Sequence, residues 1–196
     1  MFRLVVGLGN PGAKYRNTPH NVGFEVAEIL AARHGGTLCE SRRFRCALAE
    51  IAIDDAPVVL MEPLTYMNLS SEAVGHYMRY HNMGIEELLV VCDDVNLPVG
   101  RLRLRAGGSH GGQKGLLSII QALGSQEFAR LRIGIDPGAP IDDLTAYVLT
   151  PWWGEAREEM ALVCDRAADA VECAVRSGLR ESMTRYNGRD VLEPER

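Results

Sequence analysis

The groups in this sequence best suited to chemistry are an amide, an imidazole and a carboxylate that follow two apolar runs. Asn10 and His20 come after the run 2–8. Asp93 directly follows a second run, 88–92. Parallel strands end at the same edge of a sheet, where open α/β folds bind their ligands. A carboxylate orients an imidazole and leaves its other ring nitrogen free to deprotonate water, so the pattern predicts His20 as a general base with Asp93 as its partner.

Each of these residues also has a structural interpretation. Asn10 suits a turn, His20 suits the first turn of a helix, and Asp93 suits the start of a turn after its strand. A fourth polar residue, Asn68, begins an expected helix after the apolar run 57–61 and can reach the same sheet edge. Because several polar groups converge on one edge, the interpretation as a site is favoured for them together.

Other catalytic groups are missing from the sequence pattern. No serine lies in a G-x-S-x-G turn. Cys92 lies inside an apolar run, where a thiol is typically inert packing. No cluster of His, Asp and Glu has the spacing of metal ligands, so no metal is expected. The remaining nucleophile is water, with the amides of Asn10 and Asn68 holding the substrate or a developing oxyanion.

Gly7, Gly9 and Gly12 have the G-x-G-x-x-G spacing of a dinucleotide-binding turn. Such a turn must open a helix at once, and an acidic residue should end the next strand about 20 residues later. Pro11 lies inside the motif, Pro19 delays the next helix, and the expected helix occupies the place of that strand. Dinucleotide binding is therefore disfavoured, and the glycines are expected to turn the chain sharply at the sheet edge.

The charge of the chain is unevenly distributed. A formal net charge of −5 argues against a generally polycationic nucleic-acid binder. Segment 98–135 nevertheless contains one carboxylate, Glu127, and a set of cations. These cations are Arg101, Arg103, Arg105, Lys114, Arg130 and Arg132. They flank a glycine-rich loop, 107–112, and a helix start, which is a setting that holds phosphates, although a solvated strand face would show the same pattern.

The elements expected around these residues alternate between strands and helices. Strands are expected at 2–8, 44–53, 57–61, 88–92, 101–105 and 131–135. Helices are expected at 19–34, 68–82, 113–123 and 153–177. The second and third strands form a hairpin, so the sheet is mixed. We therefore predict one α/β domain, 1–187, with a twisted mixed sheet flanked by helices on both faces, and a disordered tail, 188–196.

Cysteine usage and the start of the sequence bear on the compartment. The five cysteines contain no C-x-x-C pair, and an odd number suits a reducing compartment. The sequence begins with a short strand rather than with the apolar stretch of a signal peptide, and no apolar run is long enough to span a membrane. These features favour a cytoplasmic protein that does not bind a membrane.

Five ordered segments closely resemble the bacterial peptidyl-tRNA hydrolase family and cover nearly the whole chain. They read VVGLGNPGAKYRNTPHNVGF, PLTYMNLSSEAV, VVCDDVNLPVGRLRLR, GGSHGGQKGLLSII and FARLRIGI. The resemblance implies a monomeric α/β enzyme that hydrolyses the ester joining a peptide to the ribose of tRNA. It further implies that the enzyme recycles tRNA from aborted translation, needs no metal or organic cofactor, and recognises the acceptor arm and the attached peptide.

The resemblance also assigns roles to individual residues. It places the family's catalytic histidine on His20 and its partner carboxylate on Asp93, the pair that the strand pattern had already selected. It implies that substrate is bound by Asn10, Tyr15, Tyr66, Met67, Asn68, Gln113 and Lys114. It implies that tRNA phosphates are bound by Arg105 and Arg132.

The sequence departs from the family pattern at two places. Many members have His-Asn where this chain has Gln113-Lys114, and many have a neutral or basic residue at the position of Asp136. Lysine has three donors but no acceptor, so Lys114 is expected to meet a developing oxyanion or a tRNA phosphate. His20 and Asp93 are both present, so a hydrolase is expected. The alternative is a non-catalytic RNA-binding relative, because organellar splicing factors also use this fold.

Overall fold

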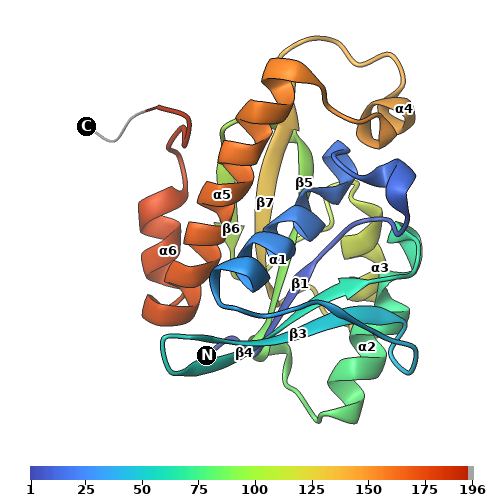
Figure 1. The fold of residues 1–196 in the computed structure, drawn as a ribbon, viewed down its shortest axis with the longest axis vertical. Coiled ribbons are helices and arrows are strands. Elements are labelled where there is room, and N and C mark those ends of the chain that lie inside the picture. The colour runs from blue at the N-terminus through green and yellow to red at the C-terminus, as the bar shows by residue number, and fades with distance from the viewer. Residues whose placement is uncertain (194–196) are drawn as a thin grey trace.

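Within residues 1–193, which the computed structural model describes, seven strands form one mixed sheet (Figure 1). The strands are β1 (Leu4–Gly7), β2 (Cys39–Ser41), β3 (Cys46–Ile53), β4 (Ala56–Pro63), β5 (Leu88–Pro98), β6 (Leu102–Arg105) and β7 (Ala129–Asp136). Their order across the sheet is β2-β3-β4-β1-β5-β7-β6. The central strands β4, β1, β5 and β7 are parallel, whereas β2, β3 and β6 run antiparallel to their neighbours.

Helices cover both faces of this sheet. They are α1 (Val22–Arg33), α2 (Ser70–Tyr80), α3 (Lys114–Leu123), α4 (Leu144–Leu149), α5 (Gly154–Ser177) and α6 (Leu179–Tyr186), with the short 3-10 turns η1 (Ala13–Tyr15), η2 (Pro19–Asn21), η3 (Met67–Leu69) and η4 (Ile85–Glu87). One hydrophobic core joins α1 and α5 to one face, and a second core joins α2 and α3 to the other. The predicted fold class is therefore confirmed. No helix of the described part of the chain is long and apolar enough to cross a membrane.

β1 shows why a continuous apolar run forms a central strand. Leu4 and Val6 point into the core with α2 and α3, whereas Val5 points into the core with α1 and α5. All three side chains are fully buried, because helices cover both faces of the sheet at this strand. The predicted hairpin is present as well, since β3 and β4 pair in an antiparallel register that ends with Ile53 opposite Ala56.

The glycines after β1 serve the packing of α1 and the turn that follows. A Cβ atom on Gly7 would collide with the backbone oxygen of Gly23, so the strand and the helix approach closely only because both residues are glycine. Gly12 has a φ of 108°, a conformation that side chains rarely adopt. The chain after Gly12 forms η1 and η2 before α1 begins, which differs from the helix that a dinucleotide-binding turn must open at its third glycine.

β5 is longer than the sequence predicts. It spans Leu88–Pro98, so Asp93 and Asp94 lie inside the strand and pair with β7, with a shift of register between Asp94 and Pro98. β7 supplies hydrogen-bond partners beyond residue 92, and the strand therefore continues past its apolar residues. The alternative in which Asp93 only begins a turn is wrong for this reason.

The sequence patterns do not reveal β2, α4 or α6, which are short elements. α4 begins after the N-cap Asp143, whose Oδ1 accepts a hydrogen bond of 3.0 Å from the backbone N–H of Ala146. α6 packs beside α5 (Figure 1), and Oγ of Ser182 donates to the backbone oxygen of Ala170 at 2.7 Å. Elements of this length contain too few residues to show a clear periodicity, and contacts with distant segments stabilise them.

The expected disordered tail, 188–196, lies partly within the described residues. The backbone N–H of Val191 donates to the oxygen of Gly100 at 2.8 Å. Asp190 forms an ion pair of 3.7 Å with Arg101, and Leu192 packs against the core that holds α1 and α5. Residues 188–193 thus make polar and apolar contacts with the domain instead of extending away from it, and residues 194–196 lie outside the described residues.

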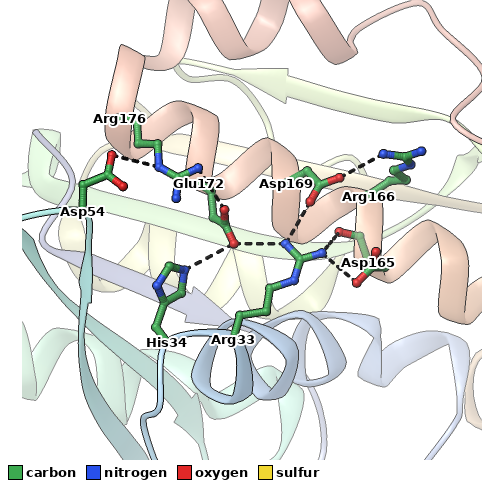
Figure 2. A network of polar contacts seen from close by, with 8 residues as sticks. All are labelled: Arg33, His34, Asp54, Asp165, Arg166, Asp169, Glu172 and Arg176. Atoms are coloured by element: carbon green, nitrogen blue, oxygen red, sulfur yellow. Dashed lines mark hydrogen bonds and ion pairs between the residues drawn. The ribbon is translucent and has the colours of Figure 1, made fainter. Parts of the chain in front are cut away.

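An ionic network joins α1 to α5 (Figure 2). Arg33, at the end of α1, donates to Asp165, Asp169 and Glu172 of α5 at distances of 2.7, 2.8 and 3.0 Å. Nε2 of His34 lies 3.3 Å from Oε1 of Glu172. One guanidinium thus meets three carboxylates, which raises the pKa of Arg33 and helps hold α1, the helix that follows His20, against α5.

Candidate active site

A cleft of about 810 Å³ lies where the polar residues after β1 meet the carboxylates of β5. Its lining includes the predicted residues Asn10, Tyr15, His20, Tyr66, Met67, Asn68, Asp93, Gln113, Lys114 and Arg132. Arg105 is not part of this lining. Segments that lie far apart in the sequence therefore meet at one sheet edge, because β1 and β5 are adjacent parallel strands.

His20 and Asp93 form a hydrogen-bonded pair inside the cleft. Nδ1 of His20 lies 2.8 Å from Oδ2 of Asp93, and both side chains are largely buried. An ionised carboxylate can only accept, so Nδ1 carries the proton and Nε2 has a free electron pair. No other residue among 1–193 forms a hydrogen bond with the His20 ring, which leaves Nε2 available to a water molecule or a substrate.

Asn10 is held in one orientation by the backbone around it. Its Oδ1 accepts a hydrogen bond of 2.9 Å from the N–H of Met67. Its backbone N–H donates to Oδ1 of Asn21 at 2.9 Å, and Nδ2 of Asn21 donates back to the Asn10 oxygen at 3.0 Å. Because Oδ1 is already used, Nδ2 of Asn10 is the group left to meet an acceptor in the cleft. Asn21 directly follows His20, but no sequence pattern marks it as part of the site.

The aromatic and amide residues around Asn10 come from two short turns. Tyr15 ends η1 and is partly buried, with Nζ of Lys14 lying 4.7 Å from the centre of its ring. Met67 begins η3 and is buried, whereas Asn68 is exposed and 57% of the surface of Tyr66 is accessible. Their exposure leaves Tyr66 and Asn68 able to contact a bound molecule.

Gln113 and Lys114 lie at the start of α3 in different environments. Gln113 is buried and is the N-cap of the helix. Both polar atoms of its side chain form hydrogen bonds within the protein, Oε1 with Leu116 and Nε2 with Asp93. Lys114 is exposed and lines the cleft. Of these two neighbours, only Lys114 therefore presents an unoccupied polar group to the cleft.

The cations of segment 98–135 separate into buried and exposed groups. Arg130 is 1% exposed, and its guanidinium donates to backbone oxygens that include those of Gln126 and Phe128. Arg132 is 8% exposed, with Nη1 lying 3.0 Å from Oδ2 of Asp94. The burial of these two side chains leaves fewer cations on the surface than the sequence indicates.

Arg132 also supports the glycine-rich loop. Its Nη2 donates to the backbone oxygen of Ser109 at 2.8 Å, while Nη1 pairs with Asp94. A Cβ atom on Gly111 would lie 2.8 Å from Nη1, so the loop passes directly over the guanidinium. Arg105, by contrast, is exposed at the end of β6 and lies opposite Arg130 in the sheet.

α4 forms a wall of the cleft that the sequence analysis did not predict. Leu144, Thr145, Val148 and Leu149 line the cleft, and α4 lies beside η2, the turn that contains His20 (Figure 1). Leu144 and Val148 are four residues apart and lie on one helical face. That spacing, after the capping residue Asp143, is the available sequence signal, but α4 has only one pair of apolar residues with this spacing.

Cys92 and possible metal-binding groups are the remaining candidates for chemistry near the cleft. Cys92 is completely buried in β5, and burial raises the pKa of its thiol, which makes it a poor nucleophile. Among residues 1–193, no group of three or more His, Cys, Asp and Glu side chains is arranged to hold a metal ion. The imidazole of His20, the amides of Asn10 and Asn68 and the ammonium group of Lys114 belong to residues that line the cleft.

Comparison with known proteins identifies the family. Residues 4–194 match the family model described as peptidyl-tRNA hydrolase. The chain belongs to the peptidyl-tRNA hydrolase family. The peptidyl-tRNA hydrolase of Desulforudis audaxviator is 46% identical over 186 residues, which cover 95% of this chain and 93% of that protein. That of Rhodopirellula baltica is 44% identical over 186 residues, which cover 95% of this chain and 97% of that protein.

A solved structure of the peptidyl-tRNA hydrolase family has the same fold. The crystal structure of peptidyl-tRNA hydrolase from Acinetobacter baumannii superimposes with a TM-score of 0.90 at 32% sequence identity, and the alignment covers 97% of each chain. These similarities confirm the family that the sequence motifs resemble. They also favour a catalytic protein over a non-catalytic RNA-binding relative, because these similar proteins are named as hydrolases.

Proposed function

We propose that this chain is a peptidyl-tRNA hydrolase that cleaves the ester between a peptide and the ribose of tRNA with water as the nucleophile. The observation that carries the proposal is the 2.8 Å contact between Nδ1 of His20 and Oδ2 of Asp93 in the cleft. It supplies an imidazole whose Nε2 can accept a proton. The exposed Lys114 and the amide of Asn10 lie in the same cleft and suit an anionic ester substrate.

In the proposed reaction, His20 takes one proton from water and later gives it to the leaving ribose oxygen. Nε2 takes a proton from water while the water oxygen attacks the carbonyl carbon of the ester. Asp93 stabilises the imidazolium that forms, and the carbonyl oxygen becomes an oxyanion. Nδ2 of Asn10, the donor left free in the cleft, is the group we assign to this oxyanion, with Asn68 holding the peptide. The bond to the ribose oxygen then breaks, and that oxygen takes the proton from Nε2, which releases a peptide acid and tRNA.

The proposed partner is the acceptor arm of tRNA with its attached peptide. Arg105 and Lys114 are exposed cations on either side of the glycine-rich loop, and they suit contacts with phosphates. Arg132 lines the cleft and its guanidinium can donate hydrogen bonds to an anion, but Asp94 already balances its charge. We therefore expect Arg105 and Lys114 to contribute more to tRNA affinity than Arg132 does.

We further propose that the protein acts as a monomer in the cytoplasm. The support is the family resemblance, together with a cleft whose His20–Asp93 pair is complete within one chain. Light scattering during gel filtration tests the oligomeric state, since a single species with the mass of one chain, 21.5 kDa, is expected. A stable dimer at the protein concentrations used in activity assays would contradict the proposed monomeric state.

The substitution His20→Ala tests the proposed function. Single-turnover cleavage of a peptidyl-tRNA should slow by about 10²–10⁴-fold, the usual contribution of a general base, while tRNA affinity stays nearly constant. The matched control is His76→Ala, because that imidazole is exposed on α2 outside the cleft lining. Cleavage at a near-normal rate by the His20→Ala variant would show that another group is the base.

A further inference from the structure

Gln113 bridges the start of α3 and the carboxylate of Asp93. Its Oε1 accepts a hydrogen bond of 2.8 Å from the backbone N–H of Leu116. Its Nε2 donates to Oδ1 of Asp93 at 3.0 Å. Only 8% of the surface of Gln113 is exposed, so solvent has little access to either bond.

These two bonds determine which way the amide points. A glutamine oxygen can only accept and its nitrogen can only donate, so the N–H of Leu116 must meet the oxygen and the nitrogen must face Asp93. Packing restrains the group further. Nε2 of Gln113 lies 3.2 Å from Sδ of Met67, and a Cβ atom on Gly115 would lie 3.0 Å from Oε1.

A donor that faces Oδ1 fixes the orientation of the Asp93 carboxylate. Nε2 of Gln113 has no electron pair with which to accept a proton, so Oδ1 must be the acceptor in this bond. The other oxygen, Oδ2, faces Nδ1 of His20 at 2.8 Å. Since an ionised Asp93 can only accept there, Nδ1 must donate.

We infer that Gln113 is a positioning residue that acts through Asp93 to fix the tautomer of His20. The backbone N–H of Leu116 orients Gln113, Gln113 holds Oδ1 of Asp93, and Oδ2 is thereby directed at Nδ1 of His20, where it keeps the ring proton. This relay leaves the electron pair of Nε2 directed away from Asp93. The use of that electron pair rests on the proposed function, whereas the tautomer itself can be measured without substrate.

The relay differs from the role that the family resemblance implies for Gln113. A residue that holds substrate by a hydrogen bond needs a free polar atom, and both polar atoms of this side chain are engaged within the protein. A simple helix cap is the competing explanation. It requires only the bond from Leu116 to Oε1, and it leaves the bond from Nε2 to Asp93 unexplained.

The substitution Gln113→Asn separates the cap from the relay. Asparagine is a preferred N-cap residue, so it can still accept from the N–H of Leu116. It is one methylene shorter, and its nitrogen is withdrawn from Asp93. We expect kcat to fall by about tenfold or more, by analogy with residues that orient metal-binding histidines, with KM and the melting temperature nearly unchanged. The ¹⁵N shifts of the His20 ring should move from a single tautomer, protonated at Nδ1, toward a mixture.

Two further variants complete the experiment. Gln113→Met removes the cap as well, so it should show the same change in the His20 ring together with a lower melting temperature. Gln121→Asn makes the same chemical change on an exposed position of α3 and should alter none of these quantities. A Gln113→Asn protein with wild-type kcat and unchanged His20 shifts would overturn the inference. Because the ¹⁵N measurement needs no turnover, it decides the relay even if His20→Ala disproves the general base.

Discussion

His20 and Asp93 are separated by 73 residues in the sequence, and their side chains form a hydrogen bond of 2.8 Å. The contact follows from the pairing of β1 with β5, in which Leu4 lies opposite Leu88 and Gly7 lies opposite Val91. The two strands are parallel, so the segment after β1 and the later residues of β5 reach the same edge of the sheet. The sheet therefore brings together the base and the carboxylate that orients it.

Replacement of Asp93 by Asn should disable catalysis with little loss of stability. The side chain keeps its size, but an amide nitrogen placed toward Nδ1 of His20 would donate and favour the wrong tautomer. We expect kcat to fall by about 10²–10⁴-fold, as for other carboxylate–imidazole pairs. Steady-state hydrolysis of a peptidyl-tRNA measures this loss. The control is Asp55→Asn, an exposed position in the hairpin turn, and equal activities of the two variants would refute the role of Asp93.

Replacement of Arg105 by Glu should weaken tRNA binding in a salt-dependent way. Each cation that meets a phosphate releases counterions, so losing one contact should lower the slope of log Kd against log salt concentration by about 0.7–0.9. Filter binding of deacylated tRNA between low and moderate salt measures the slope. Arg42→Glu makes the same charge change in the turn between β2 and β3, at the opposite edge of the sheet, and should leave the slope intact. A slope unchanged by Arg105→Glu would remove Arg105 from the tRNA contact.

Glu62 should make the protein less stable as the pH rises through neutrality. Glu62 on β4 is 7% exposed, its Oε1 has no hydrogen-bond partner among residues 1–193, and burial raises its pKa from 4.5 to about 8. The folded state therefore holds this proton more tightly than the unfolded state does. The resulting stabilisation is fully present below pH 4.5 and is lost progressively as the pH rises from 4.5 to about 8.

The substitution Glu62→Gln removes this titration while keeping the size of the side chain. We expect the free energy of unfolding of the variant, relative to wild type, to rise with pH across that window by a few kcal/mol, on the order of 1.4 kcal/mol per unit of pKa. Urea unfolding at pH 5, 7 and about 8.5 provides the measurement. Glu40→Gln, at an exposed position on β2, should show no such trend. A constant difference between Glu62→Gln and wild type would mean that Glu62 ionises normally in the folded protein.

Local patterns determined much of the fold and the centre of the candidate site. The apolar run around Val5 predicts a strand covered on both faces, and the structure buries it completely. The helix expected at 153–177 is present as α5, and Met160, Val163, Ala167 and Val171 form its buried face at helical spacing. His20 and Asp93 could be paired because parallel strands end at one edge, which is a rule that needs no coordinates. The periodicity of apolar residues is a property of residues that are neighbours in the chain, so the sequence contains it directly.

Only the tertiary structure decided which polar groups are already engaged. Arg105 and Arg132 look alike in a row of cations, yet Arg132 is buried against Asp94 and Arg105 is exposed. Gln113 lines the cleft, yet its amide already forms hydrogen bonds with Leu116 and Asp93. The length of β5 beyond residue 92 and the wall formed by α4 depended likewise on distant partners. The physical reason is common to these cases: a hydrogen bond or an ion pair depends on distance and direction between two groups, and for residues far apart in the chain only the packed fold sets these quantities.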